Sequence, residues 1–406
     1  MIMSLAWRNV WRQPRRTILS SSAIAFTTAF LIFMLSLQYG SYASMIDNTL
    51  HMFDGYAEIQ APGYHDDPDI DKAFGNVKNL LTQLKGIPGV SAITTRATGF
   101  ALLSSTKHSF SAQIVGVQAD KENKVSTIPR NIRHGHFLQT QDGGEIVLGE
   151  ELASNLDVTL GDEITMLGIG RHGAMAADSF KVVGIFRTGI KEMDRLIAEI
   201  PLQRFQETFS MQGQVHAIVF GGNSLPDFLN AMKPIRRIAQ QNGLQLLDWK
   251  ALQPGLFQAI LLDISSAALI YLAMVIVVTF ILLNTLFMSV LERTFEFGVM
   301  MSLGMRDYQI GLMIWLETIL LLCIGLVFGI ALGAAVSDYY AHHGLHFQSA
   351  EAMFQQFGLP GGMYPQLNTL TLFTGPGLVS LCIVIAGAFP ILRLRRMNPV
   401  TAMRNA

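Results

Sequence analysis

The chain has 406 residues, of which half are hydrophobic and only 15% are charged. A typical globular protein is about 25% charged, so this composition excludes a purely water-soluble protein and predicts apolar membrane segments. Because 29 Lys and Arg stand against 30 Asp and Glu, with a net charge of −1, there is no electrostatic case for a nucleic-acid binder.

Four stretches are apolar and long enough to cross a membrane as helices. Each supplies the roughly 20 apolar residues that span about 30 Å of hydrocarbon, and a helix satisfies its own backbone polar groups there. Their apolar cores carry a single charge, Glu317 in the third stretch. The four predicted transmembrane helices are residues 17–46, 258–291, 308–337 and 370–392.

The first stretch has a second interpretation, a cleaved signal peptide, because it follows a basic N-terminus and precedes the small residues at 41–44. A signal peptide has an apolar region of about 7 to 15 residues, which is shorter than this stretch. The length therefore favours a transmembrane helix.

Arginines at the membrane ends set the predicted orientation, since Lys and Arg are enriched in cytoplasmic loops. They cluster before the first stretch, between the second and third, and after the fourth. We therefore expect both termini in the cytoplasm and one large domain outside it, between the first and second helices. In chain order the predicted parts are a cytoplasmic amphipathic helix (1–16), membrane helix 1 (17–46), the outer domain (47–257), membrane helix 2 (258–291), a cytoplasmic connector (292–307), membrane helix 3 (308–337), an outer loop (338–369), membrane helix 4 (370–392) and a cytoplasmic tail (393–406).

The outer segment 47–257 is predicted to be mixed α/β. Short β-branched runs are separated by Gly, Asp and Asn turns, which is typical of strands. Between them lie stretches of helical character, one of which, 225–242, has apolar residues at helical spacing. The predicted strands are 91–95, 112–117, 145–148, 163–166 and 180–185, and the predicted helices are 78–85, 150–155, 202–208 and 225–242.

Residues 3–16 form an amphipathic pattern. One side of a helix would carry Met3, Ala6 or Trp7, Val10 and Trp11, and arginines repeat on another side. The pattern fits a helix lying in the membrane interface and, equally, a plain basic anchor. Both interpretations place the helix at the cytoplasmic leaflet.

A short amphipathic segment, 291–305, connects the second and third predicted membrane helices. A helix here would lie on the inner surface and expose Glu292, Arg293 and Glu296 to a cytoplasmic partner. As a bare pattern, the segment could equally be an inert connector.

The third membrane helix carries Gly325, Gly329 and Gly333, a spacing that lets two helix backbones approach closely in lipid. Glu317 lies upstream of this row, and a carboxyl group in hydrocarbon is by default a functional hypothesis. We favour a protonated or hydrogen-bonded packing residue over a proton relay, because the other membrane helices offer no ionisable partner.

Motifs for catalysis and for cofactor binding are missing. The sequence has no G-x-x-x-x-G-K-[ST] loop for nucleotide phosphates and no H-E-x-x-H zinc motif. Cys323 and Cys382 both lie in apolar stretches, so neither a disulfide framework nor a thiolate metal site is supported. We therefore expect a non-catalytic chain with no cofactor and no metal of its own.

Four features of the sequence resemble the permease subunits of the MacB, FtsX and LolC/LolE class of ABC transporters. The Arg-rich start, LAWRNVWRQPRRT at 5–17, resembles the opening helix of that family. The connector ERTFEFGVMMSLG at 292–304 resembles its E-R-x-x-E-I-G-x-x-x-A-x-G coupling helix, and RRMNPVTAMR at 395–404 resembles its x-x-x-D-P-V-E-A-L-R tail. Glu317 with the three glycines downstream matches the family's third span.

Three motifs of the outer segment are similar to the lipoprotein-releasing LolC/LolE branch: GEELASNLDVTLGD at 149–162, VGIFRTGIKEMD at 183–194 and IPLQRFQ at 200–206. In that branch a hairpin of the outer domain recruits a periplasmic carrier. The corresponding stretch here, 167–179, is short, rich in Gly and without proline. A periplasmic carrier is therefore an open candidate partner.

The resemblance implies a multi-pass protein of the inner membrane of a Gram-negative bacterium, with a MacB-like periplasmic core domain. It implies a dimer of two permease subunits, identical or different, and a separate cytoplasmic ATPase dimer that binds ATP and Mg²⁺. ATP-driven motion would push the coupling helix and reach the outer domain through the first two membrane helices. The implied coupling residues are Glu292, Arg293, Glu296, Gly298 and Gly304.

The implied cargo is a lipoprotein or another lipidic molecule, released from the outer leaflet. At about 0.8 kcal/mol per buried CH₂, a triacylated lipoprotein is anchored by on the order of 30 kcal/mol, so release needs an energy source. An apolar stripe, Phe26, Phe30, Phe33 and Leu37, would line a cavity for the acyl chains, and plain lipid contact explains it equally well. Rival interpretations are a MacB-like efflux permease, an FtsX-like regulator of a periplasmic enzyme and, least supported, a membrane enzyme.

Overall fold

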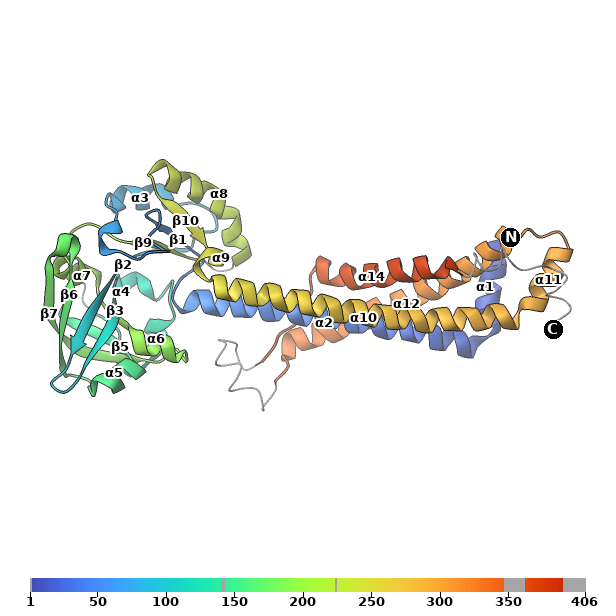
Figure 1. The fold of residues 1–406 in the computed structure, drawn as a ribbon, viewed down its shortest axis with the longest axis horizontal. Coiled ribbons are helices and arrows are strands. Elements are labelled where there is room, and N and C mark those ends of the chain that lie inside the picture. The colour runs from blue at the N-terminus through green and yellow to red at the C-terminus, as the bar shows by residue number, and fades with distance from the viewer. Residues whose placement is uncertain (1, 140–142, 223–224, 347–361, 390–406) are drawn as a thin grey trace. The chain divides into compact units, whose positions relative to one another are not determined.

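The computed structural model describes residues 2–139, 143–222, 225–346 and 362–389, which form two compact units. We call the described residues up to Ala43 and from Ile260 onward the helical unit, and those within Ser44–Ala259 the α/β unit. Among the described residues, four helices are long and apolar enough to cross a membrane: α2, α10, α12 and α14 (Figure 1). The helices of the helical unit are α1 Ile2–Arg12, α2 Pro14–Met52, α10 Pro254–Glu292, α11 Thr294–Ser302, α12 Asp307–His343 and α14 Thr369–Gly387, of which α2 and α10 also contribute residues to the α/β unit.

Proline and glycine explain where several of these helices begin and end. Pro14 and Pro254 occupy the first position of α2 and α10, where the fixed φ of proline suits a helix and its missing N–H is not needed. Gly304 and Gly344 follow α11 and α12 with φ of 93° and 69°. This left-handed conformation is readily accessible to glycine and ends a helix.

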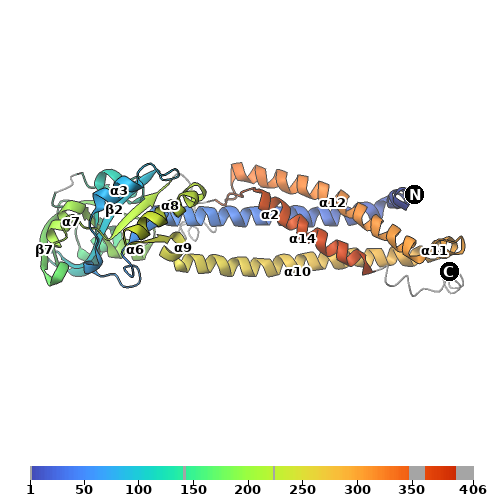
Figure 2. The ribbon, with the colours of Figure 1, turned by 90° about the horizontal axis from the view of Figure 1, so that it is seen from above.

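Helices α2, α10, α12 and α14 run alongside one another and share an apolar core (Figure 2). Helix α10 also leaves a broad apolar face exposed, which includes Leu262, Leu269 and Phe280. Such a face is expected of a helix that meets lipid or another protein. The buried side chains of the shared core are Ile24, Leu31, Val275, Leu282, Leu322, Val379 and Ile383.

The α/β unit is built on one mixed ten-stranded sheet with the order β10-β1-β9-β2-β3-β8-β5-β7-β4, and β6 pairs with β2 and β7. Strand β2 is long enough to pair with β9 along its first half and with β3 and β6 along its second half, so it connects the two ends of the sheet. The strands are β1 Ala57–Gln60, β2 Ala92–Ser104, β3 Ser109–Val117, β4 Ile132–Gly135, β5 Glu145–Gly149, β6 Glu163–Ile169, β7 Met175–Phe186, β8 Ile197–Pro201, β9 Ala217–Gly221 and β10 Gln245–Asp248.

Short helices cover this sheet, and apolar side chains from both fill the core. Phe205 and Phe209 of α7, for example, stack with ring centroids 4.3 Å apart. The helices of the α/β unit are α3 Val77–Leu84, α4 Ala119–Glu122, α5 Glu150–Leu156, α6 Lys191–Leu196, α7 Leu202–Thr208, α8 Leu225–Gln241 and α9 Trp249–Leu252, with single 3-10 turns η1 Ile70–Lys72, η2 Ile128–Arg130 and η3 Arg171–Gly173.

The predicted α/β character is confirmed, and each of the five predicted strands and four predicted helices of this unit coincides with an observed element. Strands β1, β4, β8, β9 and β10 were not predicted. All residues of β1, β8 and β9 are buried; β8 and β9 lack the alternation of apolar and polar residues that indicates a strand, and β1 alternates but has only four residues.

The stretch 167–179, which corresponds to the hairpin of the LolC/LolE branch, is the tip of the hairpin formed by β6 and β7. The two strands are closed by a tight turn in which the N–H of Gly170 donates to the carbonyl of Ala174 at 2.7 Å. His172 in this turn has a φ of 56°. The stretch is therefore ordinary antiparallel pairing with a compact tip.

Candidate functional site

Helix α1 packs against α12 through its small residues. Ala6 and Val10 are buried, and Ala6 belongs to an apolar cluster with Ile310 and Ile314 of α12. The expected grouping of all the apolar residues on one side is therefore only partly right. Met3, Trp7 and Trp11 are about half exposed, a position in which indole rings can lie in a membrane interface.

Arg293 lies in the break between α10 and α11, with φ of −103° and ψ of 12°. Its side chain is only 12% exposed and donates to both carboxylate oxygens of Glu317 and to Glu296, each at 3.2 Å. The expectation that Arg293 faces a cytoplasmic partner is therefore wrong for its side chain. Glu292 is exposed, and Glu296 is 34% exposed.

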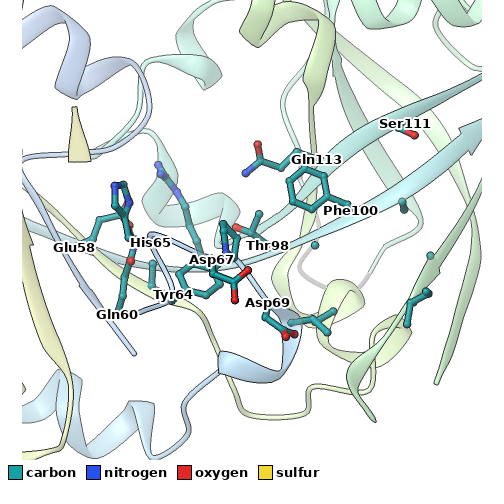
Figure 3. Close-up of a pocket in the computed structure, with 18 of the residues that line it drawn as sticks. Glu58, Gln60, Tyr64, His65, Asp67, Asp69, Thr98, Phe100, Ser111 and Gln113 are labelled. Atoms are coloured by element: carbon teal, nitrogen blue, oxygen red, sulfur yellow. Dashed lines mark hydrogen bonds between the residues drawn. The ribbon is translucent and has the colours of Figure 1, made fainter. Parts of the chain in front are cut away.

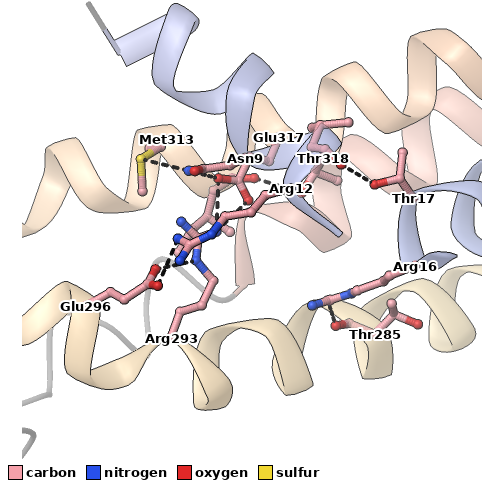
Figure 4. A network of polar contacts seen from close by, with 12 residues as sticks. Asn9, Arg12, Arg16, Thr17, Thr285, Arg293, Glu296, Met313, Glu317 and Thr318 are labelled. Carbon is pink, nitrogen blue, oxygen red and sulfur yellow. Dashed lines mark hydrogen bonds and ion pairs between the residues drawn. The ribbon is translucent and has the colours of Figure 1, made fainter. Parts of the chain in front are cut away.

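Glu317 is the meeting point of three helical segments (Figure 4). In addition to Arg293, the Asn9 side-chain amide of α1 donates to Glu317 at 2.7 Å. Arg12 of α1 pairs with Glu296 at 2.9 Å, so α1 contacts both carboxylates that Arg293 contacts. We call Asn9, Arg12, Arg293, Glu296 and Glu317 the polar ring.

The polar ring changes the interpretation of Glu317. The sequence indicated a packing residue without an ionisable partner in the other membrane helices, and the structure shows an ion pair with a residue of the connector, 24 positions earlier. The chain reversal between α10 and α12 brings the two together. A buried carboxylate that is paired and hydrogen-bonded avoids most of the cost of its desolvation.

The glycines of α12 lie where this helix touches α2. A Cβ atom added to Gly325, Gly329 or Gly333 would come within 2.6 to 2.9 Å of the nearest atom of Ile24, Thr28 or Ala29, respectively. Real Cβ atoms essentially never lie this close to a non-bonded atom, so the two backbones can approach this closely only because the glycines have no side chains. Of the other two predicted glycines, Gly298 is buried in α11 and Gly304 ends that helix.

The predicted apolar stripe on α2 divides between two environments. Phe26 is 68% exposed and stacks on Phe30, with ring centroids 6.3 Å apart. Phe33 instead packs on Tyr340 of α12 at 5.7 Å, and Leu37 is half-buried. Phe26 and Phe30 thus present exposed aromatic surface on α2.

Helices α2 and α10 are also joined by polar contacts that sequence reasoning missed. At one end, Arg16 donates to the backbone carbonyl of Thr285. Toward the other end, the Asp263 carboxylate accepts from Tyr42 and, at 3.2 Å, from Gln38. These contacts tie the two longest helices together within the helical unit. In the sequence, the charge of Asp263 at the end of an apolar stretch was the one sign of a polar contact there.

The α/β unit contains a cleft of about 650 Å³ with a polar end (Figure 3). Glu58, Gln60 and Arg96 lie in its wall and are each less than a tenth exposed. Arg96 donates to Glu122 and, at 2.6 Å, to the carbonyl of Phe53, so each of its three side-chain nitrogens already makes a hydrogen bond. Burial, together with the neighbouring Asp54, raises the pKa of Glu58 to about 7.

Glu199 on β8 is the second unusual carboxyl group of this unit. It is fully buried, and neither oxygen has a hydrogen-bond partner among the described residues. Burial and the nearby Glu122 raise its pKa well above the ordinary range, which favours the neutral acid. Within the described parts of the chain, no three His, Cys, Asp or Glu side chains are grouped so that they could hold a metal ion.

The four apolar helices and the α/β unit define a multi-pass membrane protein with a substantial folded unit outside the hydrocarbon. A model of the MacB-like periplasmic core domain matches residues 17–233, and a model of the FtsX-like permease C-terminal domain matches residues 268–399. The first match covers more than half of the sequence, so the chain belongs to the family of FtsX-like permeases with a MacB-like periplasmic core domain.

Individual relatives agree with this family. The lipoprotein-releasing system transmembrane protein LolC of Neisseria meningitidis serogroup B is 23% identical over 405 residues, 96% of this chain and 94% of the relative. The corresponding LolE of Haemophilus influenzae is 25% identical over 405 residues, 95% of this chain and 93% of the relative. The crystal structure of the periplasmic region of MacB from Actinobacillus actinomycetemcomitans covers 49% of this chain and 90% of that chain, at 13% identity and a TM-score of 0.35. The predicted resemblance is confirmed.

Proposed function

We propose that this chain is the permease subunit of an ABC transporter that releases lipoproteins, or another lipidic cargo, from the outer leaflet of the inner membrane. One observation carries the proposal: the similarity to lipoprotein-releasing LolC and LolE extends over 94% and 93% of their length. It therefore includes the connector and the membrane helices as well as the core domain, which alone would indicate only the wider family.

The energy source in this proposal is a separate cytoplasmic ATPase dimer. The chain itself has no phosphate-binding loop, so ATP and Mg²⁺ would be bound by the partner. The exposed side of α11 and the residues next to it offer a surface for it, since Phe295 of α11, Glu292 at the end of α10 and Leu303 just after α11 are exposed. A second permease subunit would cover part of the apolar face of α10.

Helices α2 and α10 are the proposed route of force to the periplasmic side. Each has 39 residues. At 1.5 Å per residue this is about 58 Å, well beyond the roughly 30 Å of hydrocarbon. Both helices contribute residues to the α/β unit, so a shift of their cytoplasmic ends can reach that unit through the backbone.

The proposal is tested by purifying the tagged chain from native membranes and identifying the proteins bound to it by mass spectrometry. We expect an ABC ATPase and a second permease subunit. The purified complex, placed in vesicles that hold a triacylated lipoprotein, should release it only when ATP and Mg²⁺ are supplied. Absence of a bound ATPase, or release without ATP, would refute the proposal.

The match to the MacB-like core domain favours one second candidate, an efflux permease. Its test is the identity of the copurified proteins, because an efflux system would bring down a tripartite export partner instead of lipoprotein. An FtsX-like regulator would differ from both. Its activity would survive bulky polar substitutions at Phe26 and Phe30, since it moves no cargo.

A further inference from the structure

Arg293 lies where the backbone between α10 and α11 leaves the helical conformation. Helix α10 ends at Glu292 and α11 begins at Thr294. Because the helical hydrogen-bond ladder is interrupted there, α11 is not a stiff extension of α10. A displacement of α11 has to reach the rest of the helical unit through side-chain contacts as well as through this joint.

The strongest of these contacts is the ion pair between Arg293 and Glu317 of α12. Both carboxylate oxygens lie 3.2 Å from the guanidinium, and both side chains are only 12% exposed, so solvent screens the pair weakly. The guanidinium also lies over the ring of Phe297, 5.2 Å from its centroid. Phe297 is itself buried in a cluster with Met313 and Ile314 of α12.

Helix α1 closes the polar ring from the other side. Asn9 donates to Glu317, and Arg12 pairs with Glu296. Each of the two carboxylates is thus bound both by α1 and by Arg293. The polar ring and the apolar cluster that contains Ala6, Phe297 and Ile314 hold α1, α11 and the first turns of α12 together. We therefore expect these three segments to move as one rigid group.

Glu317 also stands at the head of the row that packs on α2. Steps of four residues lead from Glu317 through Leu321 to the three glycines, so these residues follow one ridge that winds slowly around α12. Glu317 and Gly333 are 16 residues apart in one unbroken helix, about 24 Å. A movement of Glu317 is therefore passed along α12 to its close contact with α2.

We infer that Arg293 and Glu317 are positioning residues, whose ion pair transmits a displacement of α11 to α12 and, through the glycine row, to α2. The inference rests on the proposed function, because it takes the ATPase as the source of the displacement. It adds a route through α12 to the direct route along α10.

The first test compares variants of the purified complex in vesicles that contain a triacylated lipoprotein. Glu317→Gln keeps the shape of the side chain but removes its charge, and Arg293→Lys keeps the charge but loses the planar fork. We expect Glu317→Gln to reduce the stimulation of ATP hydrolysis by lipoprotein about fivefold or more, a typical size for coupling between sites. Basal hydrolysis and the KM for ATP should stay unchanged. Arg293→Lys should retain part of the stimulation.

Two further variants separate coupling from folding. The double variant Arg293→Glu with Glu317→Arg restores an ion pair and should recover most of the stimulation. Asp307→Asn, an exposed acid at the start of α12, should behave as wild type. Two results would overturn the inference. One is wild-type stimulation in Glu317→Gln. The other is a double variant whose stimulation is no higher than that of Arg293→Glu alone or Glu317→Arg alone. A wild-type complex without any stimulation would instead refute the proposed function on which the inference rests.

The second test measures the motion directly and needs no lipoprotein. Spin labels are placed at Leu303 and Leu332, which are exposed, after Cys323 and Cys382 are replaced by Ala. With the ring intact, the distance between the labels should be the same with and without ATP and Mg²⁺, and in Glu317→Gln it should change on ATP addition. A change in the intact protein, or no change in the variant, contradicts the inference.

Discussion

Charged residues buried in the α/β unit are the least expected feature at the residue scale. Glu58, Glu122 and Glu199 are each less than a tenth exposed, and the buried guanidinium among them is that of Arg96. A buried charge that lacks its partner is costly, and burial raises the pKa of Glu58 and of Glu199, so these two carboxyl groups are in part protonated in the folded state. Their protonation makes the stability of this unit depend on pH.

Glu58→Gln tests this dependence. The pKa of Glu58 is about 7 in the folded protein against an ordinary value of 4.5, so between these pH values the folded state binds more protons and stability falls as pH rises. The full difference is on the order of 3 kcal/mol. Glutamine cannot ionise and should raise the melting temperature of this unit, in the detergent-solubilised protein, clearly at pH 8 and little at pH 5. An equal change at both pH values would contradict the assignment.

Arg96→Met should strongly destabilise the α/β unit. Removing the guanidinium leaves Glu122 buried without its partner, and breaking a buried ion pair typically costs about 3 to 5 kcal/mol. The midpoint of urea unfolding, followed by tryptophan fluorescence, should fall accordingly. The exposed pair of Lys107 and Asp157 provides the control, since Lys107→Met should leave the midpoint unchanged. A similar loss in both variants would mean that the burial of Arg96 contributes nothing.

Residue types alone predicted part of the candidate site. Glu317 stood out because a carboxyl group in an apolar stretch is rare, and the structure gives it partners. The partner itself was not predictable, because Arg293 lies in a segment whose pattern fits a surface helix. Whether its side chain turns inward depends on the break at that residue and on the packing of α1, neither of which is encoded in local spacing.

The contact of α12 with α2 is the key feature at the scale of elements. Its glycine row was predicted as a packing motif, and the structure identifies α2 as the helix it meets. In lipid, association of helices depends on such close packing, since apolar burial gives no driving force there. The periodicity of a sequence shows that one face of a helix carries small residues, but it does not show which other helix packs against that face.

Gly329→Val should separate these two helices. The first carbon of the side chain would lie 2.7 Å from Cβ of Thr28, so α12 must shift and the row on either side loses its contacts. We expect lower thermal stability in detergent and loss of ATP-dependent release. Ala331→Val changes an exposed position of the same helix and should have little effect on either. Equal behaviour of the two variants would show that the row is ordinary lipid-facing surface.

The strands of the α/β unit show the limit of sequence patterns at this scale. Strands β5, β6 and β7 were predicted from β-branched runs between turns, and they were found there. Strand β9, whose five residues are all buried, was missed although it lies inside the sheet and joins β1 to β2. Strand order was also out of reach, because it depends on pairing between segments far apart in the chain.

At the scale of the whole molecule, the proposed function requires that α11 and the α/β unit lie on opposite sides of the membrane. Topology is the property on which coupling between ATP and cargo depends. Arginine counts favour this arrangement, since Arg12, Arg293 and Arg306 would all lie on the cytoplasmic side.

Single cysteines at two exposed positions test the topology in a chain whose Cys323 and Cys382 are replaced by Ala. Leu303→Cys marks the end of α11, and Lys107→Cys marks the α/β unit. In intact cells whose outer membrane has been made permeable, a membrane-impermeant maleimide should label position 107 and not position 303. Lysis followed by denaturation in SDS should expose both, because neither the inner membrane nor a bound ATPase then covers either side chain. Labelling of 303 before lysis, or protection of 107, would place the two parts on the wrong sides. A chain oriented in that way could not pass the force of a cytoplasmic ATPase to a periplasmic domain.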